Sequence, residues 1–220
     1  MSPYTLGIGG PADYEGLRRD VIGDFGEPRF DKLRTIDDAE LRELLDGGRL
    51  FFARTDERYI GTVYVRDKAV LTTVPNPPRY AELGGMAIRP EYRGVLVLPR
   101  DLAVSAISAF LLDNFEPDPS QLRILAHIHA ENTGVGVGLM RLGFKKIGAT
   151  RIVRGPGFEA MPVDADGFIP VTELELSRKG MIGALKTFGK LIPVHGFGGQ
   201  YSVEDDVEYA IAELEKLGDL

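Results

Sequence analysis

The sequence contains no cysteine and no tryptophan in its 220 residues. The absence of cysteine excludes disulfide bonds, zinc sites built from thiolates and a cysteine nucleophile. There is also no run of about 20 apolar residues, so no membrane-spanning helix is predicted. The first residues lack the basic segment and the apolar run of a signal peptide, and we therefore expect a cytoplasmic protein.

The chain also has no excess of positive charge. Lys and Arg number 26 against 33 Asp and Glu, which gives a formal net charge of -7. Binding to nucleic acid or to an anionic membrane needs a basic surface, so neither partner is expected. With 44% hydrophobic and 27% charged residues, the composition is that of an ordinary globular protein. The length suits one large domain, or one domain with an appendage.

The order of the predicted helices and strands indicates the fold class. Strands at 50–54 and 59–66, joined by a turn, predict a hairpin. The other predicted strands are 80–88, 122–130, 144–153 and 170–176. The predicted helices are 11–24, one that begins at Asp37, 99–113, 134–142, 178–192 and 203–217. Helices that alternate with strands in this way predict an α/β fold with a mixed sheet.

Three consecutive segments carry a resemblance to a known family. “YAELGGMAIRPEYRG” (80–94) is followed by the apolar helix 99–113 and then by “ILAHIHAENTGVGVGLMRLGFKKIG” (124–148). Together they resemble the fourth strand, the acyl-CoA loop, the next helix and the fifth strand of the GNAT superfamily of acyl-CoA-dependent N-acyltransferases. The resemblance covers about half of the chain. It implies an α/β (α+β) fold whose mixed, mostly antiparallel sheet is splayed between strands four and five, with helices on both faces.

The resemblance also implies where an acyl-CoA would bind. In the family the pantetheine arm lies between strands four and five, and the pyrophosphate lies on backbone N–H groups at the start of the next helix. The matching positions in this sequence are Met86, Ile88, Arg93, Gly94, Val95, Leu96, Val97, Leu98, Arg100 and Asn132. Leu96 and Leu98 occupy glycine positions of the family pattern, so their side chains must point away from the ligand. Two alternatives stay open: an apolar plug without a ligand at this loop, and an Asn132 that caps the next helix.

The resemblance next suggests catalytic residues for the transfer of an acyl group to an amine. Such a transfer needs a base for the amine and donors for the oxyanion. Glu82 resembles the strand-four glutamate that is the base in histone-type members, and burial in an apolar cleft is expected to raise its pKa towards neutrality. The alternative is a solvent-facing Glu82 on an edge strand. The backbone N–H of Met86 or Ala87 would serve the oxyanion.

The usual general acid of the family, a tyrosine, is missing. Its position corresponds to Leu139, so water or one of Tyr64, Tyr80 and Tyr92 would have to replace it.

Two histidines complete the candidate site. His127 and His129 alternate on one strand and therefore share a face. We expect one or both to line the acceptor pocket and to relay protons, with His127 as the second catalytic candidate and a structural role favoured for His129. As a metal pair they lack a third ligand, so no metal is expected. The nearby “TGVGVG” (133–138) does not have the spacing of a dinucleotide-binding loop.

These observations predict a GNAT-like acyltransferase domain at 1–154 and a C-terminal extension at 155–220 that packs on it. The extension would form part of the acceptor site or of a homodimer. Acetyl-CoA or another acyl-CoA is the expected donor, and a small-molecule or peptide amine is the expected acceptor. One alternative is a donor bound to an acyl carrier protein, which the basic helix 178–192 would face. The other is a GNAT-fold binding module without catalysis.

Overall fold

The computed structural model describes residues 4–22, 36–68, 79–93, 95, 97–115, 121–155, 157–158 and 161–217. Within these residues, one sheet of seven strands has the order β1-β2-β3-β4-β5-β7-β6. The strands are β1 Thr5–Ile8, β2 Leu50–Arg54, β3 Tyr59–Lys68, β4 Arg79–Ile88, β5 Leu122–His129, β6 Phe144–Val153 and β7 Phe168–Leu176. Only the pairing of β4 with β5 is parallel among these strands. The predicted mixed, mostly antiparallel sheet is therefore confirmed.

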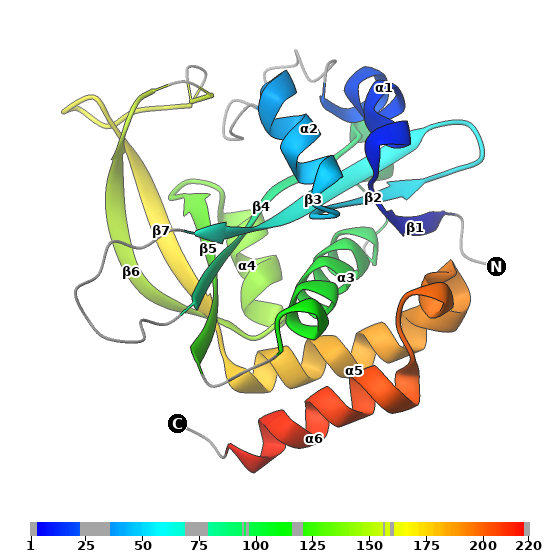
Figure 1. Ribbon diagram of the computed structural model, residues 1–220. Helices are drawn as coiled ribbons and strands as arrows, with labels where there is room; N and C mark the ends of the chain where they lie inside the picture. The colour runs from blue at the N-terminus through cyan, green and yellow to red at the C-terminus, as the bar shows by residue number, and fades with distance from the viewer. Residues whose placement is uncertain are drawn as a thin grey trace.

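Helices cover both faces of the sheet (Figure 1). A helical segment runs from Pro11 to Ile22 and contains α1 (Tyr14–Leu17), which packs with α2 (Asp38–Asp46) on one face. The other face carries α3 (Leu98–Asp113), α4 (Thr133–Arg141), α5 (Arg178–His195) and α6 (Tyr209–Lys216). Each face of the sheet thus has a separate hydrophobic core. No helix in the described part of the chain has both the length and the apolar character needed to cross a membrane.

The helix α3 lies between the sheet and α5, which explains its sequence. Residues on almost all of its sides are buried, among them Leu102, Ile107 and Leu111. A helix covered on both sides needs no polar face, so its sequence is apolar all round. Pro99 lies in its first turn, where the missing N–H removes no helical hydrogen bond.

The strand β4 contains a bulge at Gly85. Tyr64 of β3 pairs with Gly84 and Thr62 pairs with Ala87, so β4 has one extra residue between them. Gly85 has φ +59°, in the left-handed region that favours glycine. A side chain at Gly85 would overlap the ring of Tyr64. The absence of side chains at Gly84 and Gly85 therefore leaves room for the Tyr64 ring against β4.

The strands β4 and β5 part in the middle of the sheet. They pair only from Arg79–Leu122 to Glu82–Leu125. Beyond this point β4 stays paired with β3, whereas β5 pairs with β7 as far as His129–Val171. The structure thus has the splay between the fourth and fifth strands that the sequence resemblance implied.

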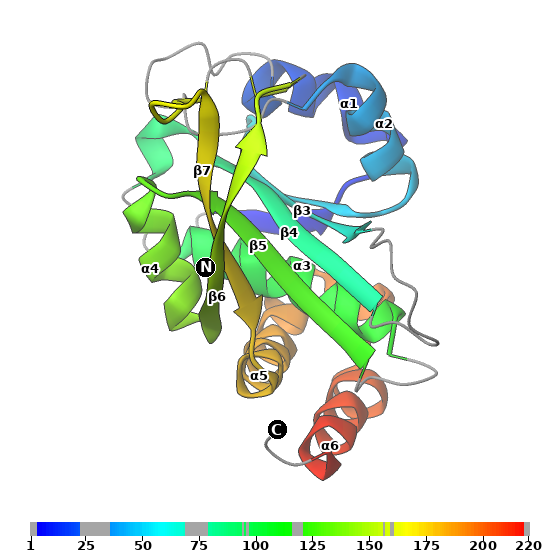
Figure 2. The ribbon, with the colours of Figure 1, turned by 90° about the vertical axis from the view of Figure 1, so that its left-hand side faces the viewer.

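The C-terminal residues complete the sheet and one of the two cores. β7 lies between β5 and β6, and α5 packs its buried face, which includes Leu185 and Phe188, into the same core as α3. Figure 2 shows the far end of the β6–β7 hairpin on the side of the molecule that carries α1 and α2. The connection between β6 and β7 therefore reaches the face of the sheet that α2 covers.

Candidate active site

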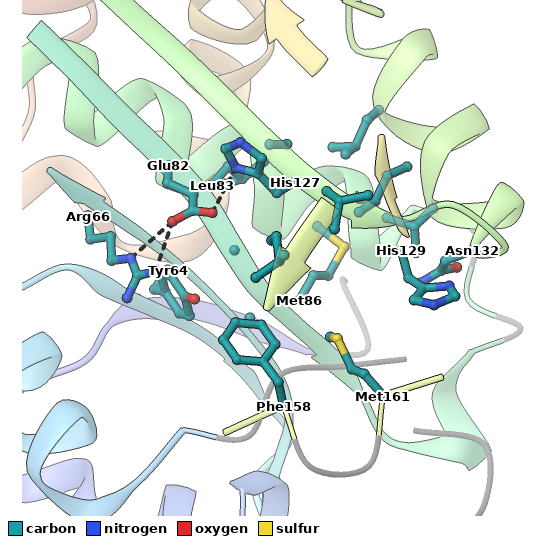
Figure 3. A pocket seen from close by; sticks show the side chains of 18 residues that line it. Tyr64, Arg66, Glu82, Leu83, Met86, His127, His129, Asn132, Phe158 and Met161 are labelled. Atoms are coloured by element: carbon teal, nitrogen blue, oxygen red, sulfur yellow. Dashed lines mark hydrogen bonds and ion pairs between the residues drawn. The ribbon is translucent and has the colours of Figure 1, made fainter. Parts of the chain in front are cut away.

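A cavity of about 130 Å³ lies where β4 and β5 part (Figure 3). On the face that carries α2 it is lined by side chains of β3, β4, β5 and the β6–β7 connection: Tyr64, Arg66, Glu82, His127, His129, Phe158 and Met161. On the opposite face it is lined by Val135 and Leu139 of α4 and by Asn132 just before it. The cavity thus passes through the sheet, and two substrates can meet in it from opposite sides.

A row of four charged side chains and one histidine (the row of charges) crosses the sheet at this cavity. Oε1 of Glu82 lies 2.9 Å from Nδ1 of His127, and Oε2 lies 2.9 Å from Nη2 of Arg66. The other end of Arg66 reaches Oε1 of Glu40 in α2 at 2.9 Å. On the far side, Nε2 of His127 lies 3.5 Å from Oε1 of Glu173 in β7. In Figure 3 the carboxylate of Glu82 points toward both Arg66 and His127.

The register of the sheet produces this row. Arg66 and Glu82 are direct partners across β3 and β4, and His127 and Glu173 are direct partners across β5 and β7. Side chains that are opposite each other in a sheet lie on the same face and interact. The row is therefore held by one helix, α2, and by four adjacent strands, β3, β4, β5 and β7.

The ionisation of Glu82 differs from the sequence-based prediction. Burial raises the pKa of Glu82, but hydrogen bonds from His127 and Arg66 outweigh the burial and lower the pKa to about 2. The predicted shift towards neutrality is therefore wrong, because it took account of the apolar cleft and not of the hydrogen bonds that His127 and Arg66 make to the carboxylate. The solvent-facing alternative is wrong as well, since only 16% of the Glu82 side chain is exposed. Glu82 is an ionised, largely buried carboxylate.

His129 has the structural role that the sequence favoured. The backbone N–H of Glu131 donates to its Nδ1 (3.2 Å), so the ring proton must be on Nε2. Nε2 in turn donates to the carbonyl of Pro162 (3.1 Å). His129 is 3% exposed and joins the end of β5 to the β6–β7 connection. Its neighbour on the same face, His127, is the histidine that contacts the carboxylates.

The residues predicted near a pantetheine arm lie on both sides of the gap. Met86 and Asn132 line the cavity, and Ile88 is buried at the end of β4. Asn132 occupies the N-cap position of α4, but its side chain makes no capping hydrogen bond there, and the residue lines the cavity. Leu139, at the position of the family tyrosine, lines the cavity, and so does Tyr64.

The loop before α3 agrees only in part with the predicted pyrophosphate site. The N–H groups of Val95 and Leu98 donate to the carbonyls of Tyr92 and Val95, so these two amides are used inside the loop. The prediction that they hold pyrophosphate needs correction for this reason. The side chain of Leu98 is fully buried, as a leucine beside a ligand would have to be.

The charged residues of this loop have partners within the protein. Nε of Arg93 donates to the carbonyl of Ile88 (3.3 Å), and Nε of Arg100 donates to Oδ1 of Asp101 (2.9 Å). Val97 directly precedes α3 and is partly exposed. Gly94 and Leu96, which the sequence also assigned to this site, lie outside the described residues.

Several site residues were not found from the sequence. Arg66, Glu40 and Glu173 become partners only through the sheet register and the position of α2, which no local pattern predicts. Phe158 and Met161 lie in a stretch rich in Gly, Pro and Asp that carries no periodicity. Among the described residues, no group of three or more His, Cys, Asp or Glu side chains is placed to hold a metal ion.

Comparison with known proteins identifies the fold. No protein-family model matches the sequence, and no curated protein matches it. An N-acetyltransferase from Staphylococcus aureus Mu50 superposes with a TM-score of 0.56 at 13% identity, over 79% of this chain and 96% of that one. Arabidopsis thaliana Naa50, in complex with the bisubstrate analogue CoA-Ac-MVNAL, superposes with a TM-score of 0.56 at 11% identity, over 80% and 99%. Spermidine N-acetyltransferase from Vibrio cholerae, with CoA and spermine, gives 0.53 at 16% identity, over 83% and 99%. The chain therefore has the fold of the GNAT superfamily.

Proposed function

We propose that the protein is an N-acyltransferase that moves an acyl group, by default acetyl, from a CoA thioester to an amine. The observation that carries the proposal is the Glu82–His127 pair, which lies in a cavity that passes between β4 and β5. The fold supports the reaction class, and two of the similar structures contain CoA or a CoA-derived analogue.

The residues on the α4 side fit the thioester end of such a donor. Met86 and Asn132 line the cavity there and supply a strand edge and an amide for the pantetheine arm. The bulge at Gly85 turns the following backbone of β4, and the N–H of Met86 is our candidate donor to the oxyanion. When bound, the donor supplies the acyl carbon that the amine attacks.

His127, held by Glu82, accepts the proton of the amine. An ionised carboxylate is only a hydrogen-bond acceptor, so the hydrogen between the two residues belongs to Nδ1. The neutral imidazole then has its lone pair on Nε2. As the amine nitrogen forms its bond to the acyl carbon, its proton passes to Nε2 and the thiolate leaves. The resulting imidazolium is stabilised by Glu82 on one side and by Glu173 on the other.

The missing tyrosine does not prevent this reaction. A thiol has a pKa of about 8.5, so a thiolate leaves readily near neutral pH and takes its proton from water. Leu139 in the place of the tyrosine therefore costs a modest part of the rate.

A test is simple because the chain has no cysteine, so a thiol reagent reports only the CoA that is released. We expect acetyl-CoA to bind by calorimetry and CoA release to depend on an added amine. Binding without amine-dependent release would favour the non-catalytic module instead.

A carrier-bound donor is the second candidate. The internal use of the Val95 and Leu98 amides favours it, because an arm on a carrier protein has no pyrophosphate to bind. Comparison of acetyl-CoA with acetyl-pantetheine separates the two. If the loop binds the nucleotide part, acetyl-CoA has a KM at least about tenfold lower, as expected for the loss of charge-assisted phosphate contacts. Equal KM values would support the carrier-bound donor.

A further inference from the structure

The half of the cavity that faces α2 is apolar apart from the row of charges. Tyr64, Phe158 and Met161 converge on it from β3 and from the β6–β7 connection, as Figure 3 shows. Ile152 and Val171 line the same side from β6 and β7. An amine that reaches His127 from this side has its nitrogen near the charges and its carbon atoms against these side chains.

The apolar wall is held in place by hydrogen bonds to the backbone carbonyls of Met161 and of the residue after it. Arg154 donates from Nη2 to the carbonyl of Met161 (3.1 Å), and His129 donates to the carbonyl of the next residue, Pro162 (3.1 Å). Met161 itself is 8% exposed and packs in a small core with Ile169 and Val171. A wall that is fixed in this way loses little conformational entropy when a ligand binds. It therefore selects ligands by their shape.

The opposite wall is fixed as well. The ring of Tyr64 is 3% exposed and lies against Gly84 and Gly85, which leave it no room to move toward β4. The charged residues among the described lining are Arg66 and Glu82, and they pair with each other. A second ammonium group on the acceptor would lose its water against apolar side chains, which is costly for a charge.

We infer that the acceptor is a primary amine carried on an apolar group, which lies between Tyr64, Phe158 and Met161. The inference rests on the proposed function and names the substrate class of the same site. The cavity limits the size of the group: a cavity of about 150 Å³ holds a benzene ring, and this one of about 130 Å³ also has to hold the acyl end of the donor, so at most about six carbon atoms fit. The same apolar wall predicts that a polyamine is a poorer acceptor than a monoamine of equal length.

A series of unbranched amines tests the inference on the unmodified protein. The substrates are the n-alkylamines from ethylamine to octylamine and, for comparison, the α,ω-diamines of the same lengths, with acetyl-CoA as donor. Each buried methylene is expected to raise kcat/KM roughly fourfold, up to about six carbons. A diamine is expected to be at least about 100-fold poorer than the monoamine of equal length. Equal rates for diamines and monoamines, or rates independent of length, would overturn the inference.

Two methionines provide a matched pair of variants. Met161→Ala removes the wall, so the ratio of kcat/KM for hexylamine to that for ethylamine should fall about tenfold. Met140→Ala is the control, because Met140 is half-exposed on α4 and does not line the cavity. Phe158→Ala gives the same test from a second side chain if Met161→Ala folds poorly. An unchanged dependence on length in both wall variants would contradict the assignment.

The outcomes distinguish the two proposals. Acetyl-CoA that binds but is transferred to none of the alkylamines or diamines overturns this inference, whereas the proposed function fails only if peptide amines are not acetylated either. Transfer that favours polyamines leaves the proposed function standing and overturns only the acceptor class.

Discussion

His127 and Glu82 form a hydrogen-bonded pair, with 2.9 Å between Nδ1 and Oε1, at the point where β4 and β5 separate. Because Arg66 holds the other oxygen of Glu82 at 2.9 Å, the carboxylate is fixed in position and in charge. In the proposed reaction the pair divides the work of a base: Glu82 orients the imidazole and stabilises its cation, and the imidazole takes the proton.

The pair predicts non-additive effects of mutation. His127→Gln should lower kcat by roughly 100-fold or more, in the range found for removal of a general base. Glu82→Gln keeps the shape of the side chain and removes its charge, and should lower kcat by about tenfold to 100-fold for the same reason. The double variant should be no slower than His127→Gln alone, because Glu82 acts through the imidazole. Steady-state rates of the four proteins measure this, and multiplicative losses would show that the residues act separately.

The contact between His127 and Glu173 predicts a loss of rate when the carboxylate is neutralised. Glu173→Gln removes a negative charge 3.5 Å from Nε2, so the imidazolium formed in the proposed reaction loses a stabilising partner. Steady-state kcat should therefore fall by roughly twofold to fivefold, the range of a partly exposed ion pair.

Glu175→Gln is the matched control for this loss of rate. Glu175 lies two residues along β7 and has nearly the same exposure, 32% against 34%, but pairs with Arg123 instead. Its kcat should equal that of the unmodified protein. A loss of equal size in both variants would mean that the effect comes from the general field of β7 and not from contact with His127.

The low pKa of Glu82 predicts a loss of stability in acid. Since the folded-state pKa is about 2, below the ordinary value of 4.5, ionised Glu82 stabilises the folded protein above about pH 4.5. This contribution is lost as the pH falls from about 4.5 to about 2. Its size is on the order of 3 kcal/mol from the shift in pKa. Urea unfolding of the unmodified protein and of Glu82→Gln should therefore give stabilities that converge over this range.

An exposed carboxylate serves as the control for acid stability. Glu91 also has a lowered pKa, because Arg89 donates to it, but it lies on the surface, where water screens the pair. Glu91→Gln should leave the pH dependence of stability nearly unchanged. If Glu82→Gln retained the full dependence, the carboxylate would not be ionised by its partners in the way the structure indicates.

The fold could be predicted from the sequence largely because its signals are local. The apolar run after the loop predicts a helix at 99–113, and α3 spans Leu98–Asp113. The alternation around His127 predicts a strand at 122–130, and β5 spans Leu122–His129. The position of β7 between β5 and β6 was not predicted, because the partner of an antiparallel strand depends on contacts far apart in the sequence.

In the candidate site, too, the local signals could be predicted from the sequence and the contacts between distant residues could not. Glu82 was a candidate through the family resemblance of 80–94, and His127 was a candidate because it alternates with His129 on one predicted strand. The direction of the Glu82 pKa was wrong because Arg66 reaches it only through the β3–β4 register. The apolar lining on the α2 side was missed because Phe158 and Met161 follow no periodic pattern, and hydrogen bonds from Arg154 and His129 hold the backbone at Met161 and at the next residue.

A pair of glycine substitutions tests the geometry at the bulge of β4. Gly85→Ala places a side chain at φ +59° and against the ring of Tyr64, so both strain and overlap oppose it. The free energy of unfolding should fall by about 2 kcal/mol or more, the sum of left-handed strain and overpacking. Gly183→Ala is the contrasting variant, since Gly183 is exposed within α5 and a Cβ there meets no atom within 4 Å. It should raise the free energy of unfolding by roughly 0.5–1 kcal/mol through helix propensity alone.

Gly85→Ala should also abolish acyl transfer while acetyl-CoA still binds at the α4 side, because the overlap displaces Tyr64 and the β4 backbone beside the reacting atoms. If Gly85→Ala were as stable as the unmodified protein, the bulge and the packing of Tyr64 against it would not be as the structure shows.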